Sequence, residues 1–96
     1  MIYATLNYEG DYSSQHHLLL RHLAANFADV EEGLQSDSWI WVFEGGQKVA
    51  VDSFTSMKHE VKAKPADSDL AKKVIEVLEK HYDVTCVEPP EAEAHD

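Results

Sequence analysis

The chain of 96 residues has few of the residues that mark several large classes of protein. A single cysteine, Cys86, excludes an internal disulfide and favours a reducing compartment, so we expect a cytoplasmic protein. Eight Lys and Arg residues stand against eighteen Asp and Glu residues, which gives a formal net charge of −10. Such a surface repels phosphate backbones and anionic lipid headgroups. We therefore expect no nucleic-acid partner and no membrane partner.

Long apolar runs and cofactor motifs are missing as well. No run approaches the roughly 20 residues that a membrane helix needs, and the first residues lack the layout of a signal peptide. The chain has no CxxC, HxxxH or DxDxDG pattern, and the segment 9–13 carries two carboxylates where a phosphate site needs glycines and cations. We expect neither a metal nor a cofactor.

Enough apolar residues are present to form one core. Hydrophobic residues make up 44 % of the chain, and the length suits one domain. We assign residues 1–88 to a single α+β domain. Residues 89–96 include two prolines and three acidic residues and no strongly apolar side chain, so we predict an acidic, flexible C-terminal tail.

The first half of the chain predicts a strand, a helix and a strand. Alternating apolar residues predict a strand over 2–8. A helix is predicted to begin near Ser13 as its cap, to carry its apolar stripe as far as Val30, and to end at Gly33. The segment 39–43 is rich in residues that favour strands and is apolar on both faces, which is typical of a strand covered on both sides.

The second half begins with a hairpin signal at Gly45-Gly46. The run 48–63 then fits either one long bent strand or two strands with a tight turn. A second helix, capped by Asp67 or Ser68, has a clear apolar stripe. A last strand is predicted over 84–87 and is expected to stop at the prolines.

This order, β-α-β-β-α-β with a long or split third strand, resembles the ferredoxin-like plait. That resemblance implies an antiparallel sheet with two helices on one face. The topology hosts many unrelated functions, so it implies no activity by itself.

Two histidines stand on the apolar stripes of the two predicted helices. His16 lies on the first stripe and His81 on the second, and antiparallel helices would bring them together near Tyr82. Two readings stay open: an imidazole hydrogen-bonded near a helix end, or a ligand-binding or pH-responsive site. Cys86 alternates with strand residues and is expected to be a small buried hydrophobe.

The aromatic strand offers a second candidate site. Trp39, Trp41 and Phe43 share one face of the predicted strand, and Tyr3 is predicted to join them from the first strand. If the helices cover the opposite face, this patch needs another cover. If the phase is reversed, the aromatics belong to the core.

We therefore expect a non-enzymatic binding or interaction module that forms a homodimer through its sheet. The alternative is a small enzyme or ligand-binding protein with a pocket near the helix ends, around His16 and His81. No residue pattern specifies a further protein or small-molecule partner.

Overall fold

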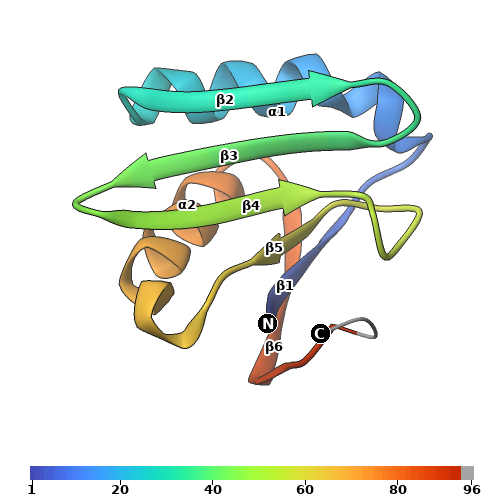
Figure 1. Cartoon of the computed structure of the whole chain (residues 1–96). Helices are drawn as coiled ribbons and strands as arrows, with labels where there is room; N and C mark the ends of the chain where they lie inside the picture. The colour runs from blue at the N-terminus through green and yellow to red at the C-terminus, as the bar shows by residue number, and fades with distance from the viewer. Residues whose placement is uncertain (94–96) are drawn as a thin grey trace.

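The computed structural model describes residues 1–93 and shows an α+β chain with six strands in this range (Figure 1). The elements in chain order are β1 (Ile2–Asn7), α1 (Tyr12–Asn26), β2 (Asp29–Leu34), β3 (Ser38–Glu44), β4 (Gln47–Asp52), β5 (Glu60–Lys62), a 3-10 turn (Pro65–Asp67), α2 (Ser68–Glu79) and β6 (Asp83–Glu91). All strand pairs are antiparallel, and the sheet order is β2-β3-β4-β5-β1-β6. This order differs from that of a simple plait.

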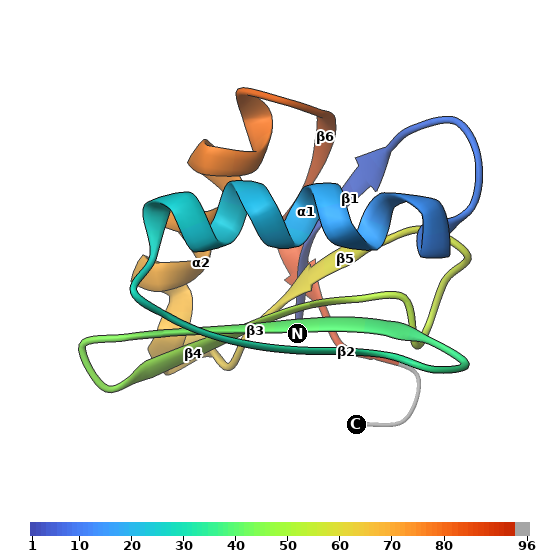
Figure 2. The ribbon, with the colours of Figure 1, turned by 90° about the horizontal axis from the view of Figure 1, so that it is seen from above.

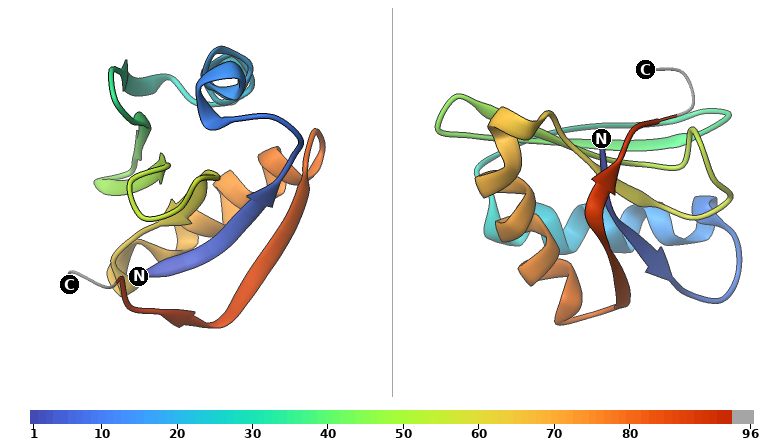
Figure 3. Two further views of the ribbon diagram at one scale, coloured as in Figure 1. Left: turned by 90° about the vertical axis from the view of Figure 1, so that its right-hand side faces the viewer. Right: turned by 90° about the horizontal axis from the view of Figure 1, so that it is seen from below.

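Both helices cover one face of the sheet (Figure 2). α1 contacts β2 and β3, whereas α2 contacts β4, β5 and β6. The sheet curls around the two helices, so the core lies in its concave side (Figure 3). The core combines one face of each central strand with the apolar stripes of the helices, and its fully buried members include Leu6, Leu19, Leu23, Ile40, Val42, Val49, Val51, Val61, Val74 and Leu78. The opposite face of the sheet has no helix over it.

The run 48–63 forms two strands rather than one. β4 and β5 pair with each other, with Ala50 opposite Lys62 and Asp52 opposite Glu60. The segment 53–59 reverses the chain between them. Of the two readings that the sequence left open, the split strand is confirmed.

The first helix ends earlier than its apolar stripe predicts. α1 stops at Asn26, whose side-chain amide donates to the carbonyl of His22 at 2.8 Å. The following residues form β2, in which Val30 pairs with Val42. The prediction that Val30 belongs to the helix and that Gly33 caps it is wrong, because pairing along β3 satisfies this backbone better than a further helical turn.

Side chains from outside the predicted positions cap both helices. The carboxylate of Asp11, not Ser13, accepts the N–H of Ser14 at 2.9 Å and caps α1. At α2 the N–H of Leu70 donates to the side chain of Gln47 at 2.9 Å. Gln47 begins β4, so this bond ties the second helix to the sheet.

The β3–β4 hairpin confirms the glycine signal. Gly45 and Gly46 have φ angles of +58° and +78°, the positive values that a primed two-residue turn requires. This turn sets the register that places Trp41 opposite Ala50.

The last strand continues past the prolines. β6 runs through Pro89 and Pro90 to Glu91, because it is an edge strand and a proline without an N–H is tolerated there. Beyond the strand, the Glu93 carboxylate lies 3.0 Å from Lys62 Nζ. The expectation that the strand ends before Pro89 is wrong. Residues 94–96 of the predicted tail lie outside the described residues, as does His95 among them.

Within residues 1–93, neither helix has the length and apolar character needed to cross a bilayer.

Candidate functional site

A chain of five hydrogen-bonded side chains, here called the histidine relay, runs through the core beside α1. It consists of Tyr8, His59, Ser38, His16 and Glu32. Tyr8 follows β1 and His59 precedes β5; Ser38 begins β3, His16 lies on α1 and Glu32 on β2. The relay therefore connects five separate segments of the fold.

The bonds along the relay are all short. The Tyr8 hydroxyl lies 2.7 Å from His59 Nδ1, and His59 Nε2 lies 2.6 Å from Ser38 Oγ. The same oxygen lies 2.6 Å from His16 Nδ1, and His16 Nε2 lies 2.7 Å from the Glu32 carboxylate. The side chains of His16, Ser38 and His59 are completely buried, whereas Glu32 is 41 % exposed. One end of the relay thus reaches solvent through a carboxylate.

Counting hydrogens assigns the direction of these bonds. His16 Nε2 faces a carboxylate, so it carries a hydrogen, and the neutral ring accepts at Nδ1. The single hydrogen of Ser38 then goes to His16, and Ser38 accepts from His59 Nε2. His59 Nδ1 is left to accept the hydroxyl hydrogen of Tyr8. Every group is satisfied with both rings neutral and Glu32 ionised.

The electrostatics of the relay agree with this assignment. Burial lowers the pKa of His59 to about 4, and the nearby His16 ring adds to the shift. Burial also raises the pKa of Tyr8 to about 12, so its hydroxyl keeps its hydrogen at neutral pH. Lys58 stands over the Tyr8 ring, with Nζ 4.5 Å from the ring centroid. Burial is therefore the main reason that the ring of His59 is neutral at pH 7.

The predicted pairing of His16 with His81 is not what the structure shows. His81 is exposed and stacks on His22, with ring centroids 3.6 Å apart. Tyr82 lies closer to the predicted place, because its hydroxyl donates to Gln15, the neighbour of His16. α2 ends at Glu79, so His81 follows the helix and does not continue its apolar stripe.

Ser38, His59 and Glu32 were missed, although the sequence holds a signal for the first two. Ser38 alternates in phase with Ile40 and Val42, and His59 alternates in phase with Val61. A polar residue at a core position of a strand needs a buried partner. The third member, Glu32, lies in a segment that we predicted to be helical, so its direction toward α1 was not foreseen.

The relay has the order Glu, His, Ser of a hydrolase triad, but it does not expose a nucleophile. Ser38 Oγ is buried and shared between two rings. Its backbone is also held, because its N–H donates to Ser53 Oγ at 3.0 Å. A substrate carbonyl has no route to this oxygen in the described structure. The relay is therefore a buried hydrogen-bond network in the core and not a hydrolase triad.

The second candidate site, here called the aromatic sheet surface, consists of Trp39, Trp41 and Phe43 on the face of the sheet opposite the helices. All three are half-buried, whereas Ile40 and Val42 between them are completely buried under the helices. Of the two phases that the sequence left open, the structure has the aromatics on the outer face.

Gly33 and Lys48 shape this surface. The rings of Trp39 and Trp41 lie 4.4 Å apart between centroids. Trp39 lies over Gly33 of β2, where a Cβ would come within 2.5 Å of its ring. Lys48 Nζ lies 3.8 Å from the Trp41 ring, a cation–π contact. A hollow of about 500 Å³ lies beside Trp39 and is lined in part by Phe54, which is 55 % exposed.

Charge is divided across the aromatic sheet surface. The neighbouring strand β2 places Asp29 opposite Phe43 and Glu31 opposite Trp41. On the other side β4 places Lys48 opposite Phe43. The β2 side of the surface is therefore acidic, whereas the β4 side carries one lysine, Lys48, and has Asp52 opposite Trp39.

Tyr3 does not belong to the aromatic sheet surface. A bulge in β1 follows Ile2, and Tyr3 lines a hollow of about 460 Å³ with residues of α2 and β6. Cys86 lines the same hollow and is exposed, which corrects the prediction that it is buried. The irregular register turns Tyr3 toward the helix side, where alternation alone predicts the other face.

A buried ion cluster lies beside the aromatic sheet surface on β4 and β5. Lys62 Nζ lies 2.6 Å from Asp52 and 3.0 Å from Glu93, and it donates to Thr55 at 2.7 Å. Burial alone would lower the pKa of Lys62, but its bonds to the two carboxylates outweigh this and raise it. Burial raises the pKa of neighbouring Glu60, whose Oε1 has no hydrogen-bond partner. The cluster joins the C-terminal segment to the sheet.

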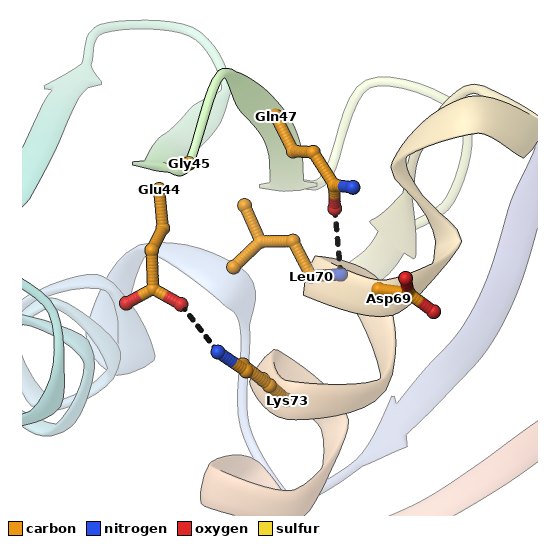
Figure 4. Close-up of a pocket in the computed structure, with 6 residues that line it drawn as sticks. All are labelled: Glu44, Gly45, Gln47, Asp69, Leu70 and Lys73. Atoms are coloured by element: carbon orange, nitrogen blue, oxygen red, sulfur yellow. Dashed lines mark hydrogen bonds and ion pairs between the residues drawn. The ribbon is translucent and has the colours of Figure 1, made fainter.

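The hollow in Figure 4 lies where α2 is bonded to the sheet. It has a volume of about 330 Å³ and lies between the β3–β4 hairpin and the start of α2. Two bonds bridge it: Gln47 accepts the N–H of Leu70 at 2.9 Å, and Lys73 lies 2.8 Å from Glu44. These bonds fix α2 against the sheet.

Residues 1–93 contain no group of three or more His, Cys, Asp or Glu side chains placed to hold a metal ion. The chain matches no known family model, no curated protein and no solved structure. Its function is therefore inferred from the two sites alone.

Proposed function

We propose that the protein is a non-enzymatic binding module that forms a homodimer through its aromatic sheet surface. The observation that carries the proposal is the pair Trp39 and Trp41, which stay half-buried on the face opposite the helices. Each large aromatic can bury about 150–250 Å². All three rings are already half-buried, so they leave only part of this area exposed, and a second copy would cover them together with the flanking residues of β2 and β4.

Charge complementarity supports a second copy as the partner. A two-fold axis that runs through the patch parallel to the strands would bring the acidic side of one copy, at Asp29 and Glu31, against Lys48 of the other. The net charge of −10 on each copy opposes association at long range. Local pairing of opposite charges around a buried aromatic centre offsets that repulsion.

The same proposal includes a reading of the topology. In a ferredoxin-like plait the first and third strands lie in the centre, the last beside the first and the second beside the third. The strands β6-β1-β5-β4 follow this order, with α1 before β4 and α2 after β5. We infer a plait with an inserted β2–β3 hairpin between α1 and β4. The insertion carries the aromatic sheet surface.

The alternative of a small enzyme or ligand-binding protein around His16 and His81 is less well supported. His16 is completely buried and its two ring nitrogens already have partners. His81 lies elsewhere, on His22. We also propose the cytoplasm as the location, because an exposed free thiol at Cys86 suits a reducing compartment.

Light scattering tests the dimer. We expect wild-type protein to have the mass of a dimer at micromolar concentration and Trp41→Glu to be a folded monomer, because the substitution places a charge at the centre of the patch. Leu18→Glu is the matched control: Leu18 is 43 % exposed on α1, on the other side of the molecule. It should remain a dimer.

Two results would contradict the proposal. If the wild-type protein stays monomeric at high micromolar concentration, the proposed homodimer does not form. A Trp41→Glu variant that keeps the dimer mass would show that copies meet on another surface. Far-ultraviolet circular dichroism of each variant establishes that the fold is retained.

A further inference from the structure

The histidine relay fastens the β2–β3 hairpin to the rest of the fold. Glu32 and Ser38 belong to the hairpin, whereas His16 lies on α1 and His59 before β5. Each relay member on the hairpin is next in sequence to Trp39 or to the glycine that lies under its ring. Ser38 precedes Trp39, and Glu32 precedes Gly33, over which the Trp39 ring lies.

The relay can hold one added proton on its rings but not two. With one ring charged, Ser38 still has one ring nitrogen to which its hydroxyl can donate, and the bonds rearrange along the chain. With both rings charged, both nitrogens that face Ser38 carry hydrogens. The hydroxyl hydrogen then has no acceptor, and two cations share one buried oxygen.

The surroundings favour charge at one end only. The titratable and charged groups that face the relay rings, from every element packed around them, are Tyr8, Asp11, His17, Glu32, Lys58 and Tyr82. The one carboxylate bonded to a ring is that of Glu32, on His16. The His59 end has Lys58 nearby, over the Tyr8 ring. A proton on His16 is thus compensated, whereas a proton on His59 is not.

We propose that the histidine relay is an acid-operated latch that holds the β2–β3 hairpin in place until both rings are charged and then releases it. Release moves Ser38 and with it Trp39, so the aromatic sheet surface loses its shape. Release of the hairpin does not depend on the proposed function. Only its effect on assembly does: if the aromatic sheet surface mediates dimerisation, acid separates the dimer.

Nuclear magnetic resonance reads the latch directly in the full chain. We expect both His16 and His59 to show the tautomer with hydrogen on Nε2 at pH 7. On acidification from pH 7 to about 3, the indole N–H of Trp39 should shift in the same step in which the second relay ring becomes charged. Light scattering over the same range should show the dimer separating in that step.

Variants separate the latch from a general effect of acid. His59→Gln removes the second titratable ring, so the step in which both rings are charged should disappear. His81→Gln is the matched control, because His81 is exposed and outside the relay. It should leave the step in place. If His59→Gln does not fold, Glu32→Gln serves instead. It removes the carboxylate that compensates a charge on His16, so the step should move to a lower pH.

The outcomes distinguish the latch from the dimer. A Trp39 signal that shifts before the second ring is charged, or does not shift when both are charged, overturns the latch whatever the oligomeric state. A His59 tautomer with hydrogen on Nδ1 at pH 7 also overturns it. A wild-type monomer at pH 7 whose Trp39 signal follows the two rings overturns the proposed function and supports the latch.

Discussion

At the scale of single residues, Gly33 provides the space that the Trp39 ring fills. A Cβ at this position would lie 2.5 Å from the ring, closer than non-bonded atoms approach. The glycine does not have a positive φ, so its role is to leave room and not to allow an unusual backbone. The tilt of the two tryptophan rings on each other depends on this gap.

Gly33→Ala is therefore expected to push the Trp39 ring off β2 and separate it from Trp41. The free energy of unfolding should fall by about 1 kcal/mol, because the ring loses its contact with the strand. Circular dichroism of the coupled tryptophans and urea denaturation measure the two effects. Asp29→Ala is the control: it lies on the same strand opposite Phe43, away from both tryptophans in the pairing, and should preserve the coupling. Unchanged coupling in Gly33→Ala would refute this account.

His59 gives the protein a defined response to acid. The pKa of His59 is about 4 in the folded protein, against roughly 6.5 in an unfolded chain. Between these values the unfolded chain binds more protons, so the free energy of unfolding falls as the pH falls from 6.5 to 4. The contribution is fully present above this window, and its loss amounts to about 3 kcal/mol.

Urea denaturation at a series of pH values measures this loss. His59→Gln should show a flatter dependence between pH 6.5 and 4, because the residue that takes up the proton on unfolding is gone. His17→Gln, an exposed histidine of α1, should keep the wild-type slope. Equal slopes in wild type and His59→Gln would contradict the assignment.

At the scale of elements, the short strand β5 depends on a buried charge. Its three residues are all buried, and Val61 alone faces the core under the helices. Lys62 points to the other face, where Asp52 and Glu93 neutralise it. A strand of this length adds few backbone hydrogen bonds, so the ion cluster contributes to holding it between β4 and β1.

Lys62→Met is expected to lower the free energy of unfolding by about 3 kcal/mol, since it leaves the buried carboxylate of Asp52 without a cation. The control is Lys73→Met. Lys73 pairs with Glu44 at the surface, where both side chains are largely exposed, so that variant should lose less than about 1 kcal/mol. Thermal and urea denaturation compare them. Equal losses would show that burial of the Lys62 pair has no special weight.

At the scale of the whole molecule, the two ends of the chain are joined along one edge of the sheet. Ile2 pairs with Glu91, and Glu93 reaches Lys62. The acidic end of the chain therefore neutralises a buried cation, although the net charge of −10 makes the surface as a whole repel it.

Deleting residues 91–96 is expected to destabilise the protein, contrary to the reading of this segment as a free tail. The deletion removes the pairing of Glu91 and the partner of Lys62, so the melting temperature should fall by about 5 °C or more. Glu93→Gln should reproduce part of the loss, whereas Glu88→Gln, at an exposed position of β6, should not. An unchanged melting temperature in the deletion would restore the original reading.

The histidine relay shows how far local patterns lead. His16 on an apolar stripe, and Ser38 and His59 in phase with core residues, were each visible in the chain as polar groups at buried positions. Which of them meet depends on strand order. His81 looked like the partner of His16 because helical periodicity was extended past Glu79, where α2 ends. Periodicity assigns a residue to a face but not to a neighbour.

The sequence alone determined the α+β class, the two helices, the glycine hairpin and the fact that Trp39 and Trp41 share one face of their strand, because each follows from spacing within a few residues. The tertiary structure decided the rest. Residues 29–34 form a strand because they can pair with β3. The run 48–63 is divided into two strands because its second part, β5, pairs with β1 as well as with β4. Such choices depend on hydrogen bonds between residues far apart in the chain, and no local pattern carries that information.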